Sequence, residues 1–267
     1  MKLSSLKYFF LIPLLSFIPR DGYRQIENTS FGPGEFFEYK VHYGLFNAAE
    51  ARVSVNPQIQ TVNGRPCFKV DIAGKTVGAF DWVSRIRDNW QSWIDTSAIV
   101  PQKSYRNIQE DKYRKEETVI YNHAKDERNA ARATVTDENG QKNYDIPNNA
   151  QDVISGYYFL RTIDFNKYSS GDVINIPAFF DREIYSMKIR YRGRETVKTK
   201  FGTIAAIKLN PVLSTNNQLF KGDNSIRIWV SDDANKVPVR VEVDLWVGSM
   251  VMEMRKYGGL RQDFKWQ

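Results

Sequence analysis

Short stretches in which apolar and polar residues alternate recur along most of this 267-residue chain, and they constrain its fold more than any other feature. In residues 237–247, Val239, Val241 and Val243 alternate with Arg240 and Glu242. Successive side chains of a β-strand point to opposite faces, so this pattern predicts a strand with one buried and one solvated face. The same reasoning predicts strands over residues 36–43, 51–55, 58–62, 67–73, 89–94, 99–107, 114–122, 131–136, 142–146, 172–176, 183–192, 195–199, 202–210, 225–230 and 250–257.

The connections between these stretches are short and turn-like. Asn63-Gly64 favours a hairpin because both residues accept a positive φ, and Gly248-Ser249 is a second turn. Strands that follow one another without intervening helices pair as antiparallel neighbours. The sequence therefore predicts an all-β, mainly antiparallel protein, built as a large curved sheet or an open or half β-barrel. Residues 31–267 are expected to form a single β domain, although a division into two lobes near Asn148 is allowed.

One segment departs from the strand pattern. Between residues 149 and 163, Val153, Ile154 and Tyr157 fall at helical spacing, so a helix is expected there, with Asn148 or Asn149 as its cap. Residues 76–83 allow a second, short helix, which Gly78 disfavours.

The first 22 residues resemble a secretory signal peptide. Lys2 and Lys7 precede an apolar run over residues 8–18, and this run is shorter than the ~20 residues that a membrane-spanning helix needs. The pattern has no clean small-x-small cleavage site, with Ser16 the nearest candidate. We therefore expect an exported protein that is not transmembrane once the signal is removed.

Charge and chemistry exclude several classes of function. The formal net charge is +7, but acidic and basic residues are interspersed rather than gathered on one face, which argues against nucleic-acid binding. Cys67 is the only cysteine, and His42 and His123 are the only histidines. Neither a metal site nor a cofactor is expected, and these three residues are predicted to have structural or surface roles.

Four motifs, in this order, give the chain a resemblance to a known family. They are the segments 34–44, 152–161, 191–203 and 229–240, which read GEFFEYKVHYG, DVISGYYFLR, YRGRETVKTKFGT and WVSDDANKVPVR. Together they resemble the DUF3108 family of exported bacterial proteins, a domain of unknown function. The resemblance implies a location in the bacterial periplasm or cell envelope, and it brings no catalytic residues. A fainter resemblance, to the open β half-barrels of periplasmic lipoprotein carriers, concerns the fold alone.

Aromatic residues supply the candidate ligand-binding site. Trp82, Trp90 and Trp93 lie close in sequence beside charged residues, although Trp90 and Trp93 would face opposite sides of one strand. Further candidates are Trp229 and the helical residues Tyr157, Tyr158 and Arg161. For each of them, packing in the core is the competing interpretation.

Three functions agree with this pattern. The first is a binding or carrier protein that holds a lipid or another apolar or amphipathic molecule on a curved sheet. The second is a non-catalytic scaffold that binds an envelope protein through its sheet edges. The third is a hydrolase that uses Asp232 and Asp233, although a turn is the preferred interpretation of these two residues. An outer-membrane barrel is disfavoured, because residues 113–118 would expose charge to lipid.

Overall fold

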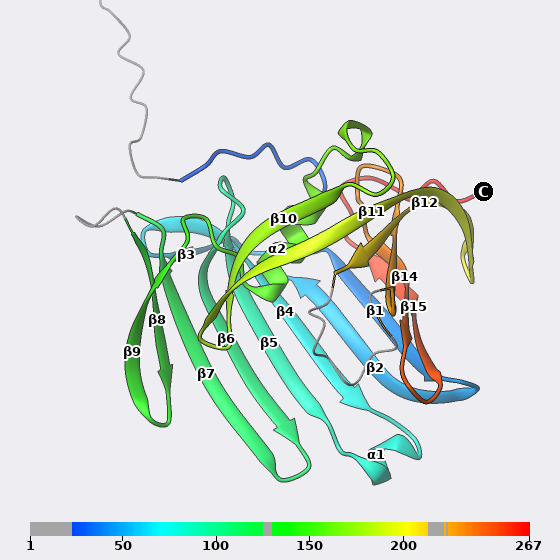
Figure 1. The fold of residues 1–267 in the computed structure, drawn as a ribbon, viewed down its shortest axis with the longest axis horizontal. Helices are drawn as coiled ribbons and strands as arrows, with labels where there is room; N and C mark the ends of the chain where they lie inside the picture. Colours follow the sequence, from blue (N-terminus) through cyan, green and yellow to red (C-terminus); the bar gives the residue numbers. More distant parts are fainter. Residues whose placement is uncertain (1–22, 125–129, 213–221, 223) are drawn as a thin grey trace, which may run out of the picture.

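The computed structural model describes residues 23–124, 130–212, 222 and 224–267. The expected signal segment, residues 1–22, lies outside the described residues. The strands form one continuous sheet in which all neighbouring strands are antiparallel (Figure 1). From edge to edge the order is β10 (Val173–Phe180), β11 (Glu183–Thr199), β12 (Gly202–Pro211), β13 (Ile226–Ser231), β14 (Pro238–Asp244), β15 (Ser249–Gly258), β1 (Phe36–Tyr43), β2 (Phe46–Val55), β4 (Arg65–Thr76), β5 (Arg87–Asp95), β6 (Pro101–Glu110), β7 (Tyr113–Asn122), β8 (Ala131–Asp137) and β9 (Gly140–Ile146), while β3 (Gln60–Val62) pairs with β4.

The chain builds this sheet in two meanders. It first runs outward from β1 to the edge strand β9, crosses to the opposite edge at β10, and then returns strand by strand until β15 pairs with β1. The two edges approach each other, because Gln151, which follows β9, forms a parallel bridge with Ala178 of β10. The result is a nearly closed, barrel-like sheet, which confirms the predicted fold class. The sheet is continuous through β15 and β1, so it is not divided into two lobes at Asn148.

The crossover from β9 to β10 contains the main helix, α2 (Val153–Arg161). A helix was expected here, but neither Asn148 nor Asn149 caps it: Asn149 has a φ of 56° and lies outside the helix. Asp152 is the cap instead, with its Oδ1 accepting from the Ser155 backbone N–H at 2.6 Å, while the Ser155 Oγ accepts from the Asp152 N–H at 2.9 Å. The short helix α1 (Phe80–Val83) joins β4 to β5, and the 3₁₀ helix η1 (Phe165–Lys167) follows α2.

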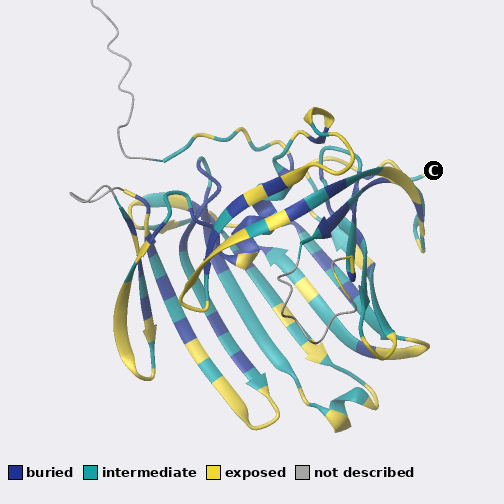
Figure 2. Ribbon diagram, viewed as in Figure 1, coloured by how far each residue is buried: buried dark blue, intermediate teal, exposed yellow. Residues whose placement is uncertain are grey.

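Helix α2 lies on the concave side of the sheet, in contact with β5 and β10 (Figure 1). Its residues Ile154 and Tyr158 pack with Phe31, Phe68 and Ile94 in a buried cluster. A hydrogen bond of 2.7 Å from Ser92 Oγ to Asp152 Oδ2 ties the helix to β5, and burial raises the pKa of Asp152. Dark blue residues gather around the helix in Figure 2, whereas the lower part of the concave face is largely intermediate. The densest part of the core therefore lies at the helix end.

A buried ion pair fastens the other end of α2. Arg161 donates to both carboxylate oxygens of Glu35, at 2.5 and 2.7 Å, and both side chains are at most 1% exposed. The same guanidinium donates from Nε to the Asn235 carbonyl at 2.8 Å and from Nη2 to the Ser30 carbonyl at 3.1 Å. One side chain thus joins the helix, the segment entering β1, and the loop between β13 and β14.

Candidate functional site

The concave face carries apolar side chains beyond the reach of α2. Val41 of β1 is in register with Met252 of β15, which pairs with Val241 of β14, which in turn pairs with Ile228 of β13. Paired residues of antiparallel neighbours point to the same face, so these four side chains form one row across four strands. We call this set the apolar row. All four are partly exposed, whereas Tyr39, Val239 and Met254, one step nearer to the helix on the same strands, are buried.

The apolar surface continues across β2, β4 and β5. Val53 is in register with Ile72, and Ile72 with Trp90, and all three are partly exposed. Val53, Ile72, Trp90 and Tyr157 of α2 pack against the same buried cluster. The helix thus borders an apolar concave surface that runs from β13 to β5.

A polar cluster ends this surface on the β6–β7 side. Trp90 stacks on Phe180 with ring centroids 5.8 Å apart, and the Arg106 guanidinium lies 5.0 Å from the centroid of the Phe180 ring. Arg106 is buried and pairs with Glu117 at 2.8 Å and with Asp181 at 2.7 Å. Hydrogen bonds from Lys115 and Arg106 lower the pKa of Asp181. The concave face is therefore amphipathic, with an apolar floor and an ion-paired side.

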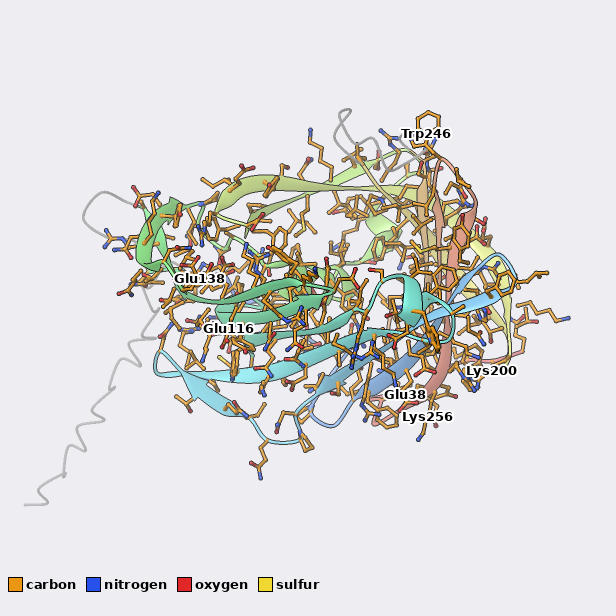
Figure 3. The ribbon with its side chains drawn as sticks, turned by 90° about the horizontal axis from the view of Figure 1, so that it is seen from below. Glu38, Glu116, Glu138, Lys200, Trp246 and Lys256 are labelled. Atoms are coloured by element: carbon orange, nitrogen blue, oxygen red, sulfur yellow. The ribbon has the colours of Figure 1, made fainter. Side chains whose placement is uncertain are left out.

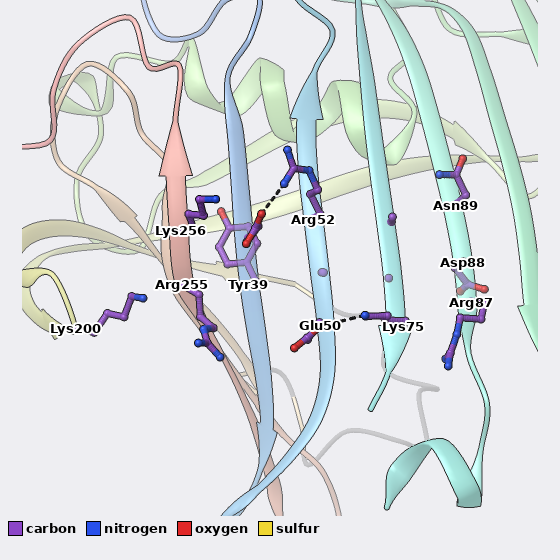
Figure 4. Close-up of a pocket in the computed structure, with 14 residues that line it drawn as sticks. Tyr39, Glu50, Arg52, Lys75, Arg87, Asp88, Asn89, Lys200, Arg255 and Lys256 are labelled. Carbon is purple, nitrogen blue, oxygen red and sulfur yellow. Dashed lines mark hydrogen bonds and ion pairs between the residues drawn. The ribbon is translucent and has the colours of Figure 1, made fainter. Parts of the chain in front are cut away.

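The convex face presents a different surface, a cavity of about 960 Å³. Glu38, Arg52, Ala73 and Asn89 form a register row that points away from α2, and Figure 4 views this face with the helix behind the strands. Glu50 and Lys75 form an ion pair of 3.3 Å across the cavity floor. Its charged lining includes three acidic residues, Glu38, Glu50 and Asp88, and six basic ones, Arg52, Lys75, Arg87, Lys200, Arg255 and Lys256. This is a cavity open to solvent in which basic side chains outnumber acidic ones.

The predicted site residues separate in the structure. Trp90 and Tyr157 border the concave surface together, whereas Tyr158 is fully buried in the core beside them. Arg161 is buried in its ion pair with Glu35. The other three predicted tryptophans, Trp82, Trp93 and Trp229, do not border the concave surface.

Each of these three tryptophans has its own surroundings. Trp93 points to the convex face, as the parity with Trp90 predicted, and its Nε1–H donates to Gln60 at 2.7 Å. Trp229 is buried, donates to Glu195, and has the Lys208 ammonium 5.0 Å from its ring centroid. Trp82 on α1 is 93% exposed and touches neither surface.

Asp232 and Asp233 form a turn, which is the interpretation that the sequence favoured. Asp233 Oδ1 accepts the backbone N–H of Asn235 at 2.9 Å and the Ser231 hydroxyl at 2.8 Å, while Asp232 pairs with Arg194 at 2.8 Å. The Asp233 carboxylate thus stabilises the reversal between β13 and β14, and the Asp232 carboxylate ties that reversal to β11. In the described part of the chain, no three His, Cys, Asp or Glu side chains lie where they could share a metal ion.

Sequence reasoning missed the apolar row. Val41, Val241 and Met252 lie in predicted strands, and strand parity alone does not tell an accessible side chain from a buried one. The available signal was position along the strand: each lies closer to the hairpin end than a large buried partner such as Tyr39 or Met254.

Two solved structures are similar to this chain. A solved structure described as a beta-barrel-like protein of the domain of unknown function DUF1849, from Brucella abortus, superposes with a TM-score of 0.51 at 10% identity, covering 84% of this chain and 97% of that one. A candidate lipoprotein from Parabacteroides distasonis gives a TM-score of 0.39 at 9% identity, covering 88% and 99%. At these identities, the first likeness shows the fold alone.

Comparison of the sequence with protein families identifies the family of this chain. No curated protein sequence matches the chain. Among the residues that the structure describes, no helix is both long enough and apolar enough to cross a membrane. The model of the family described as "Protein of unknown function (DUF3108)" matches residues 38–255, most of the chain. The chain therefore belongs to the DUF3108 family.

Proposed function

We propose that this protein is a binding or carrier module that holds an apolar or amphipathic small molecule on its concave face. The observation that carries the proposal is the apolar row of Val41, Met252, Val241 and Ile228, which is partly exposed although it faces the inside of the sheet. Apolar side chains on a concave surface with few polar neighbours are typical of small-molecule sites. Covering them with a ligand would remove apolar surface from water.

The composition of the concave face supports an amphipathic molecule. Its apolar part would cover the row and Ile72, and its polar part would face Arg106 and Lys115. Arg106 is already paired with Glu117 and Asp181, so the polar side of the ligand need not carry a full charge. A ligand of this kind matches both halves of the surface.

We further propose that the protein works outside the cytoplasm, in the bacterial periplasm or cell envelope. The support is the signal-like pattern of residues 1–22, together with the export that the resemblance to the DUF3108 family implies. Cell fractionation, with sequencing of the N-terminus of the recovered protein, tests this directly. Recovery of the full-length chain in the cytoplasm alone would contradict it.

Replacing Met252 with Gln is expected to weaken binding of N-phenyl-1-naphthylamine, whose fluorescence rises in apolar surroundings, by roughly 10-fold. The substitution would place an amide in the middle of the apolar row, so the ligand would lose contact and the amide would lose water. Fluorescence titration of the wild type and the variant measures the dissociation constant.

The matched control is Val251→Gln. Val251 is the preceding residue on β15, is also partly exposed, and points to the convex face beside His42. Equal losses in the two variants, or no probe binding by the wild type, would contradict the proposal. Native mass spectrometry of the protein purified from its own compartment then identifies any molecule that remains bound.

A scaffold role is the second candidate, and the sheet edge favours it. β9 is bonded to β8 on one side, and within the described residues no strand pairs with its other side. Five of its seven residues are exposed. A free edge can accept a strand from a partner. A polypeptide rather than a small molecule in the native mass spectrum would favour this role.

A further inference from the structure

Three successive turns at one end of the sheet expose large apolar side chains. They are the β14–β15 turn, the β1–β2 turn and the α1 connection between β4 and β5. Strand order and register place them side by side, because β14, β15, β1, β2, β4 and β5 are consecutive neighbours in the sheet. Tyr43 at the end of β1 pairs with Met250 at the start of β15, and Ala49 near the start of β2 pairs with Thr76 at the end of β4. We call this edge the rim. Its exposed apolar residues are Leu45, Phe46, Trp82, Val83, Trp246 and Val247.

The exposure of these side chains is extreme. Leu45 is 98% exposed, Trp82 93% and Trp246 67%. Figure 3 shows Trp246 projecting from the edge of the molecule, away from Glu38, Lys200 and Lys256. Single exposed apolar residues are common on protein surfaces, but six on three adjacent turns form a shared apolar edge, and such edges mark interaction sites.

The turns are held in place rather than splayed apart. The Tyr43 hydroxyl donates to the Val247 carbonyl at 2.7 Å, and its ring packs edge-on against Phe80 of α1, with centroids 5.8 Å apart. The Val77 N–H donates to the Ala48 carbonyl at 3.0 Å, which ties the α1 connection to β2. One tyrosine thus links all three turns, so the exposed side chains keep fixed relative positions.

The β1–β2 and β14–β15 turns of the rim carry no charge. Residues 43–49 and 245–252 contain no Asp, Glu, Lys or Arg. Asp81 on α1 is paired with Arg87 at 2.6 Å and accepts from the Thr76 hydroxyl at 2.8 Å. Arg85, also on the α1 connection, is exposed, and Lys40, Glu50, Lys75 and Asp244 carry charge of both signs farther along the strands. Apolar tips, two exposed tryptophans and a charged band behind them follow the order of polarity across the surface of a bilayer.

We propose that the rim docks onto a lipid bilayer and inserts its three apolar tips between the headgroups. The tips are separate and protrude, which suits a deformable lipid surface better than a preformed protein groove. Two of the three turns carry no charge and need no anionic headgroup, so a zwitterionic phospholipid suffices. The inner face of the same strands leads from the rim, through Tyr43 and Met250, to the apolar row. This inference rests on the rim alone and holds whether or not the concave face binds a ligand.

The chain offers a site-specific test, because its single cysteine, Cys67, is buried. A Leu45→Cys variant of the full chain is labelled with a polarity-sensitive fluorophore and mixed with phosphatidylcholine vesicles. The label is expected to shift to the blue and to be quenched by brominated lipid, and 1 M NaCl should leave both effects unchanged. The control is Ile59→Cys, which is also exposed but lies beyond the opposite end of β2.

Two substitutions test the tryptophans without disturbing the core. In the labelled Leu45→Cys protein, Trp82→Ser with Trp246→Ser should raise the lipid concentration needed for half-maximal binding by roughly 100-fold. Probe binding at the concave face should stay unchanged, which separates this inference from the proposed function.

Three results would overturn the inference. They are an equal shift at Ile59→Cys, the absence of any shift at Leu45→Cys, and a shift that depends on protein concentration without lipid. The last would mean that a second copy of the chain covers the rim.

Discussion

Replacing Arg161 with Met is expected to lower the free energy of unfolding by about 3–5 kcal/mol, because it leaves the carboxylate of Glu35 buried without its cation. The guanidinium also supplies donors to the carbonyls of Asn235 and Ser30, which lie in different parts of the chain. Its carbon centre lies 5.2 Å from the ring centroids of both Phe31 and Tyr158, so packing is lost as well as charge. Urea denaturation followed by circular dichroism measures the change.

Two further variants separate charge from packing. Combining Arg161→Met with Glu35→Gln removes the uncompensated charge, so the double variant should be more stable than Arg161→Met alone. The matched control is Arg52→Met, because Arg52 pairs with Glu38 on the surface, with side chains 51% and 37% exposed, and should cost less than about 1 kcal/mol. A loss in Arg161→Met no larger than in the control would contradict the role assigned to the buried pair.

The importance of Arg161 shows how far sequence reasoning reaches. An arginine on a helix beside two tyrosines suggested a ligand site, because aromatic and cationic side chains often line one. The partner that decides its role, Glu35, lies 126 residues away in the chain. No local pattern links the two, so only the folded arrangement shows that Arg161 is structural.

The positions of the strands and the face to which each side chain points were easier to predict than the pairing between strands. The alternation in β14 and the parity of Trp90 and Trp93 depend only on the period-two geometry of a strand, and both were predicted correctly. The pairing of β1 with β15 joins the two ends of the domain and has no local signal. The start of α2 was misplaced because Asn149 has a positive φ and the capping box begins at Asp152.

The candidate site depended on which side chains are accessible to solvent. The alternation of faces along a strand does not determine this. Met252 and Met254 lie on the same face of β15, yet Met254 is buried and Met252 is partly exposed, because the cluster around Phe37 and Tyr39 covers only the end near α2. Large aromatic residues were the natural candidates from sequence, but of these only Trp90 and Tyr157 border the concave surface. The proposed ligand surface is formed instead by the apolar row, which contains no aromatic residue.

Lowering the pH from 7 to 4 is expected to destabilise the protein through His123 by about 3 kcal/mol. Burial lowers the pKa of His123 from its ordinary 6.5 to about 4. Its Nε2 lies 2.8 Å from the Pro101 carbonyl, which can only accept, so Nε2 carries the proton of the neutral ring. Within the described part of the chain, Nδ1 has no hydrogen-bond partner, so a second proton would be buried without an acceptor.

The direction of the stability change follows from the pKa of His123 in the unfolded chain and in the folded protein. As the pH falls from 7, the unfolded chain takes up a proton near 6.5 while the folded protein does not, so stability is lost progressively until about pH 4. Asp152 acts in the opposite direction, because burial raises its pKa, but it contributes equally to the wild type and to a His123 variant. The measurement is therefore the difference between wild type and His123→Asn in urea unfolding at pH 7 and pH 4. His123→Asn should lose about 3 kcal/mol less than the wild type over this range, and equal losses would mean that the pKa of His123 is the same in the folded and the unfolded protein.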